Sequence, residues 1–128
     1  FVRSASFFVV RATNQAPRYM KAKTSDVIVN TFAQAVRDVL GDKLIAIYWF
    51  GSRANSKGDE DSDYDLLLET RETLTYAERD RVLDITIHIT AEHGCLLDVH
   101  YYTVAELHQH PLSNTPFIQN VMKEGVPI

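Results

Sequence analysis

The chain has few of the residues that cross-link or interrupt a fold, with one cysteine, four prolines and five glycines in 128 residues. A single cysteine, Cys95, excludes an intramolecular disulfide and is typical of a protein from a reducing compartment, so we expect a cytoplasmic location. Because Cys95 is followed by two leucines, we interpret it as a small buried apolar side chain and not as a reactive thiol.

Long apolar runs and an excess of positive charge are also missing. No segment approaches the roughly 18 consecutive apolar residues that cross a bilayer, so we expect no membrane association. The chain carries 17 acidic and 13 basic residues, and its net charge of −4 argues against direct nucleic-acid binding, which usually requires a basic surface. The hydrophobic share of 45% is ordinary for a globular domain and is sufficient for a core.

The beginning of the sequence lacks an initiator methionine. The apolar residues 7–10 are too few for the core of a signal peptide, and Met20 opens a more conventional start. We therefore interpret residues 1–19 as a non-native or upstream extension, in which residues 6–11 have the composition of an edge strand, and residues 20–128 as a single domain.

Hydrophobic patterning predicts alternating helices and strands in that domain. Residues 75–93 fit both a helical and a strand period, and their length before Gly94 favours a helix. Capping residues and periodicity predict further helices, and short apolar runs predict strands. The expected helices cover residues 24–40, 75–93, 103–109 and 116–123, and the expected strands cover residues 44–50, 63–69 and 96–102. This order predicts an α/β (α+β) fold in which helices cover a small mixed β-sheet.

Three aspartates in the predicted strands carry the first chemical signal. Asp63 and Asp65 are two positions apart, so their side chains lie on the same face of a strand, about 6–7 Å apart. Asp98 lies among aliphatic residues in the third strand, where an ionised carboxylate is costly unless it is paired or binds a metal. If the two strands are neighbours, the three carboxylates meet at one edge of the sheet and form an oxygen-rich site of the kind that suits Mg²⁺.

Gly51 and Ser52 follow directly after the first predicted strand. A glycine at this point lets the backbone approach a ligand closely, and the amides and the hydroxyl of the following turn can face a phosphate. Nucleotidyl transfer depends mainly on positioning and charge neutralisation. A phosphate-binding turn beside metal-binding carboxylates is the arrangement that this chemistry needs.

The spacing of these residues resembles a known signature. Gly51-Ser52, ten further residues and then Asp63-Tyr64-Asp65 resemble the pattern of the DNA polymerase β-like nucleotidyltransferase superfamily. Residues 50–54 together with 62–68 resemble its small branch, the minimal nucleotidyltransferases (MNT). The resemblance implies a nucleotidyltransferase fold for residues 20–128.

The resemblance also implies roles for individual residues. By analogy with the family, Asp63, Asp65 and Asp98 are the catalytic, Mg²⁺-binding carboxylates. Asp98 is in addition the candidate to take the proton of the acceptor hydroxyl. Gly51 and Ser52 are expected to bind the triphosphate of ATP, the nucleotide donor.

Many MNT proteins are antitoxins paired with a HEPN-domain ribonuclease toxin, to which they transfer AMP on a tyrosine. The resemblance therefore implies a protein adenylyltransferase antitoxin with a HEPN toxin as its partner. Because the chain is short, we expect a partner chain or a second subunit of a homo-oligomer to complete the acceptor site. Two alternatives remain open. One is nucleotidyl transfer to a small hydroxylated molecule such as an antibiotic, and the other is a non-catalytic antitoxin that occludes its toxin.

A calcium loop is a rival interpretation of the same acidic segment. Asp61, Asp63, Asp65 and Glu72 fall at positions 1, 3, 5 and 12 of an EF-hand-like loop. Leu66 stands where such a loop needs glycine, within a run of three leucines that favours a strand. We therefore reject the calcium interpretation.

Other charged residues carry weaker signals. Arg53 either helps to neutralise phosphate charge at the nucleotide site or pairs with an acidic loop residue. His100 lies two positions beyond Asp98 and either lines the site or is a satisfied packing residue. His108 and His110 lack further ligands at zinc spacing, so we do not expect a zinc site.

Overall fold

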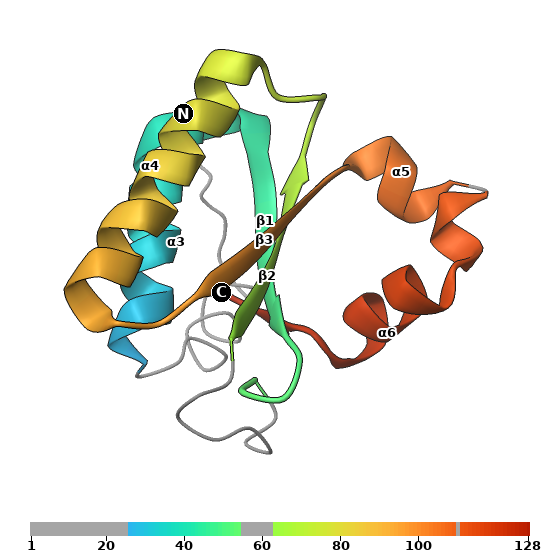
Figure 1. Ribbon diagram of the computed structural model, residues 1–128. Coiled ribbons are helices and arrows are strands. Elements are labelled where there is room, and N and C mark those ends of the chain that lie inside the picture. The colour runs from blue at the N-terminus through green and yellow to red at the C-terminus, as the bar shows by residue number, and fades with distance from the viewer. Residues whose placement is uncertain (1–25, 55–62, 110) are drawn as a thin grey trace, which may run out of the picture.

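The computed structural model describes residues 26–54, 63–109 and 111–128 (Figure 1). The extension at residues 1–19 and the edge strand expected at residues 6–11 lie outside these ranges. In the described part of the chain, no helix is both long and apolar enough to cross a membrane.

The described residues form a four-stranded sheet in the order β3-β2-β1-β4. β1 (Leu44–Phe50) pairs antiparallel with β2 (Tyr64–Thr70), and β2 pairs parallel with β3 (Leu97–Thr103). The expected mixed sheet is confirmed, and β2 and β3 are each shifted by one residue from their predicted bounds. β4 (Val126–Pro127) pairs antiparallel with β1, and the sequence does not predict it because two residues that include a proline carry no strand pattern.

Two long helices pack against each other on one face of the sheet (Figure 1). α3 (Val27–Leu40) begins at Asp26, whose carboxylate accepts hydrogen bonds from two amides of the first turn. α4 (Tyr76–His93) begins at Thr75, which forms a capping box, and ends at Gly94 in the left-handed conformation. The ambiguous segment is therefore a helix, as its length predicts.

Two shorter helices, α5 (Val104–His108) and α6 (Pro116–Glu124), lie on the other side of the sheet (Figure 1). The 3₁₀ turns η1 (Gly41–Lys43) and η2 (Leu112–Asn114) follow α3 and α5. Both short helices were expected within one or two residues of these bounds. They divide the molecule into three layers with the sheet in the middle.

The sheet is buried on both faces by two hydrophobic clusters. In β2, Leu66 and Leu68 face the main core under α3 and α4, whereas Leu67 faces the smaller cluster under α5 and α6. All three leucines are fully buried, which explains why β2 reads as a continuous apolar run. Cys95 packs against the main core, and burial raises the pKa of its thiol, in agreement with an unreactive packing residue.

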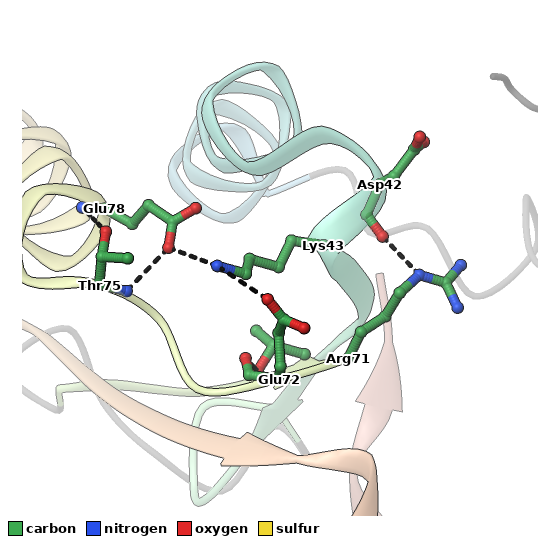
Figure 2. A network of polar contacts seen from close by, with 7 residues as sticks. Asp42, Lys43, Arg71, Glu72, Thr75 and Glu78 are labelled. Carbon is green, nitrogen blue, oxygen red and sulfur yellow. Dashed lines mark hydrogen bonds and ion pairs between the residues drawn. The ribbon is translucent and has the colours of Figure 1, made fainter.

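A polar network fixes the start of β1 to the start of α4 (Figure 2). Lys43 Nζ donates a hydrogen bond of 2.8 Å to Glu78, which also accepts one from the backbone amide of Thr75. The bond to Lys43 holds the pKa of the Glu78 carboxyl below its usual range. Arg71 donates to the carbonyl oxygen of Asp42 at 2.7 Å. This end of the sheet is thus closed by polar contacts, and the candidate site lies at the opposite end of β1.

Candidate active site

Asp65 and Asp98 lie side by side on neighbouring strands. They are register partners in the parallel pairing of β2 and β3, and partners of this kind project from the same face of a sheet. Asp63 directly precedes β2, two positions before Asp65. Because residues two apart in an extended segment share a face, Asp63 lies on the same face as Asp65. Tyr64, between them, is buried in the main core. The three aspartates are therefore brought to the face opposite α3 and α4.

The crowding of negative charge affects Asp65 directly. Burial raises the pKa of its carboxyl above the usual range, and the charges of Asp98 and Asp63 raise it further. His100 acts in the opposite direction. A bound cation would relieve the repulsion between these carboxylates, so the electrostatics of this face favour a positively charged ligand.

Gly51 follows the last residue of β1 and lies beside Asp65. Its φ of 85° lies in the left-handed region that favours glycine. A Cβ at this position would lie 2.2 Å from Oδ2 of Asp65, a distance at which atoms overlap. Backbone conformation and the nearby carboxylate therefore both favour glycine, and the turn lies beside Asp65.

The two residues after Gly51 differ in their surroundings. Ser52 is exposed in the turn. The Arg53 guanidinium lies 4.4 Å from the ring centroid of Tyr64 and donates a hydrogen bond of 3.1 Å to its hydroxyl, which in turn donates to Asp26 at 2.8 Å. Burial and the bond to Asp26 raise the pKa of Tyr64 to about 12. Arg53 is thus linked through the Tyr64 hydroxyl to Asp26 at the start of α3.

His100 adjoins Asp98 on the site face, with 3.3 Å between Nε2 and Oδ2. Its ring also contacts Phe50 and Phe117, with centroids 5.7 Å and 5.2 Å away. His100 therefore both packs and lines the site. The sequence gives no indication of Phe117, because its proximity depends on how α6 folds back over the sheet.

Another carboxylate, Glu69, lies further along the same face of β2 and is only 4% exposed. It accepts a hydrogen bond of 3.3 Å from the hydroxyl of Tyr48, and its other oxygen lies 3.2 Å from Nε2 of His108. Burial and the Glu69 charge raise the pKa of Tyr48. The sequence does not mark Glu69 as a buried group, because its partners come from β1 and α5. His110, the other histidine considered for zinc, lies outside the described residues.

The geometry after β2 supports the rejection of a calcium loop. The three leucines that would form its centre lie in the fully buried middle of β2. Glu72 lies beyond the strand, where its carboxylate is 3.6 Å from Nζ of Lys43. Asp61, the first residue of the hypothetical loop, lies outside the described residues.

The acidic face does not enclose a metal site by itself. Within residues 26–54, 63–109 and 111–128, no three His, Cys, Asp or Glu side chains are gathered closely enough to hold a metal ion by themselves. Mg²⁺ commonly takes one or two carboxylates and completes its shell with waters and substrate phosphates. The open cluster of Asp63, Asp65 and Asp98 therefore suits a metal that binds together with a nucleotide.

Comparison with protein families gives a match to the family described as polymerase beta nucleotidyltransferases, over residues 34–128. The matched region contains the sheet, the glycine turn and all three aspartates. It confirms the nucleotidyltransferase fold that the motif spacing implies.

Individual relatives agree with this match. The chain is 28% identical over 101 residues to a protein of Methanocaldococcus jannaschii that is named as a candidate protein adenylyltransferase, covering 79% of this chain and 95% of that protein. Among solved structures, it is similar to a chain of a toxin–antitoxin crystal structure with AMP-PNP, with a TM-score of 0.55 and 21% identity. A mutant of the toxin–antitoxin MntA-HpeT gives a TM-score of 0.52 and 20% identity. Both structures cover 77% of this chain and share 69% of their own length with it, and they show the same fold.

Gly51→Ala should damage the site more than the same change at another left-handed glycine. Gly94 has a φ of 69° and open space where a Cβ would point, so Gly94→Ala adds only backbone strain, of about 1–2 kcal/mol. Gly51→Ala adds similar strain and also pushes against Asp65. We expect a larger fall in melting temperature and no stabilisation by Mg²⁺ and AMP-PNP. Equal melting temperatures and equal ligand-induced shifts in the two variants would contradict this account of Gly51.

Asp65→Asn should make the free protein more stable. Because the folded-state pKa of Asp65 is raised, the fold binds this proton more tightly than the unfolded chain and loses stability as the pH rises through that pKa. The amide removes the repulsion, so the melting temperature at neutral pH should rise by a few degrees. The control is Asp84→Asn, which changes an exposed carboxylate on α4 and should leave the melting temperature unchanged. A lower melting temperature for Asp65→Asn, measured across pH 3–8, would show that the carboxylate stabilises the fold.

Proposed function

This chain belongs to the polymerase β nucleotidyltransferase family, and we propose that it is a Mg²⁺-dependent protein adenylyltransferase that transfers AMP from ATP to a tyrosine of a HEPN-domain toxin. The observation that carries the proposal is the pairing of Asp65 with Asp98 across β2 and β3, directly beside the Gly51 turn. A purely structural pair of carboxylates would gain nothing from lying side by side, because their charges repel each other.

The residues of this face fit a hard divalent cation. The donors are carboxylate oxygens, which Mg²⁺ prefers. Burial and, after it, the charges of Asp98 and Asp63 raise the pKa of Asp65, so a cation would be favoured there. Asp63, Asp65 and Asp98 would supply its protein ligands, and water and the nucleotide phosphates would supply the others. When bound, Mg²⁺ neutralises the phosphate charge that develops during transfer. The missing Cβ of Gly51 leaves the turn close to this position.

The residues of the chain then have separate tasks. The amides of the Gly51–Ser52 turn and the exposed Ser52 hydroxyl would orient the triphosphate. Asp98 would accept the proton of the acceptor hydroxyl, whose oxygen forms a bond to the α-phosphorus while the bond to the pyrophosphate oxygen breaks. The Asp98 side chain is 57% exposed, which leaves it accessible to an acceptor presented by another molecule.

The protein acceptor is supported by the relatives. One is named for protein adenylyl transfer, and the two solved structures compared above are toxin–antitoxin structures, one of them with AMP-PNP. On this proposal a partner chain would present the acceptor tyrosine.

The test is transfer of label from α-³²P-ATP to a co-encoded HEPN protein in the presence of Mg²⁺. Wild-type protein should label the partner, and Asp65→Asn should reduce the rate by at least about 100-fold, because it removes a carboxylate at the reacting phosphate. Asp84→Asn, which changes an exposed carboxylate on α4, should retain full activity.

The outcomes separate the alternatives. Protection from the toxin that survives Asp65→Asn without any labelling would identify a non-catalytic, occluding antitoxin. Labelling of a small hydroxylated molecule but not of the HEPN protein would identify a small-molecule nucleotidyltransferase. Removal of Mg²⁺ with EDTA should abolish labelling, and unchanged labelling would contradict the metal requirement.

A further inference from the structure

His100 lies where it can control the orientation of Asp98. On the basis of the proposed function, we propose that His100 is a positioning residue, which holds the Asp98 carboxylate toward Asp65 and is itself held by Phe50 and Phe117. The 3.3 Å separation of His100 Nε2 from Asp98 Oδ2 is the observation from which this inference starts.

The direction of this hydrogen bond follows from the chemistry of the pair. An ionised carboxylate can only accept, so Nε2 carries the hydrogen and donates it to Asp98. Asp98 is 57% exposed, and an exposed aspartate can otherwise rotate about its side-chain bonds. A hydrogen bond to one oxygen restricts that rotation and leaves the other oxygen for a ligand. Carboxylates that bind metals are commonly oriented by such outer hydrogen bonds.

The imidazole is in turn fixed by aromatic neighbours. Phe50 and Phe117 meet edge to face, with centroids 5.5 Å apart and an interplanar angle of 80°, and the His100 ring packs against both. Phe50 is the last residue of β1, and Phe117 is in the first turn of α6. The ring orientation of His100 therefore depends on contacts from two elements that are far apart in the sequence.

Anchoring of α6 makes this arrangement rigid. Ile118 and Val121, both 1% exposed, bury α6 in the smaller hydrophobic cluster with Leu67 of β2. These contacts fix the backbone of α6, from which Phe117 reaches His100. On this proposal α6 acts on the acidic site through the contact of Phe117 with His100.

Stabilisation of the fold is an insufficient explanation for the pair. Exposed ion pairs contribute little to folding, and the side chains of His100 and Asp98 are 32% and 57% exposed. The chain offers a matched control in His93, which lies 3.7 Å from Glu92 at the end of α4, away from the site face. A positioning role predicts that only the His100 pair affects the site.

The experiment separates the ring from its hydrogen-bond donor. His100→Phe keeps an aromatic ring between Phe50 and Phe117 but cannot donate, whereas His100→Gln keeps a terminal N–H but loses the ring. His93→Phe is the control. We would measure the affinity for Mn²⁺ in the presence of AMP-PNP by EPR, and kcat and KM for ATP in the labelling assay.

We expect His100→Phe to weaken Mn²⁺ binding by about tenfold and to lower kcat with little change in KM for ATP. His100→Gln keeps a donor but loses the packed ring, so it should recover only part of both losses, and His93→Phe should behave as wild type. If the wild-type protein is active and His100→Phe has the same Mn²⁺ affinity and the same kcat, the positioning role of His100 is wrong and the proposed function still stands. If the wild-type protein binds no Mn²⁺ with AMP-PNP, the proposed function fails, and the positioning role fails with it.

Discussion

The lateral contact between Asp65 and Asp98 is the constraint on which the rest of the structure depends. Two carboxylates paired across neighbouring strands repel each other, so the sheet must be stable enough to hold them in register. The neighbouring residues of β2 supply that stability, because Leu66, Leu67 and Leu68 are fully buried, on alternating faces of the strand. The parallel pairing of β2 with β3 is set by this burial, since a shift of one residue would turn the leucines to the wrong faces and separate the aspartates.

The two faces of the sheet perform different tasks. α3 and α4 cover one face with the main core, and the polar network around Lys43 fixes the end of the sheet that lies away from Gly51. On the other face, α5 and α6 pack over Leu67 and leave the neighbouring aspartates accessible. The acidic cluster is thus fixed at the backbone and open at its side chains, which is what a site requires when the substrate brings part of the metal shell.

Features that depend on local patterns could be predicted from the sequence. Helical periodicity before Gly41, the apolar run of β1 and the two-residue spacing of Asp63 and Asp65 each follow from a single segment. Features that depend on long-range contacts could not be predicted. The pairing of β4 with β1, the burial of Glu69 and the packing of Phe117 on His100 arise only after distant segments meet. Arg53 illustrates the same limit, because the ring that it contacts belongs to Tyr64, the first residue of the next strand, β2.

The C-terminal segment connects these observations. β4 pairs with Tyr48 and Trp49 of β1, and Ile128 donates its amide hydrogen to the carbonyl of Ile47 at 2.9 Å. Arg37 of α3 donates to the main-chain oxygen of Ile128, the residue after β4, so α3 is tied to the segment that follows α6. Because β4 follows α6 directly, this pairing also fixes α6 over the site face. The position of Phe117 beside His100 is therefore determined by the same pairing that completes the sheet, and the geometry at Asp98 depends on residues that never reach the acidic cluster.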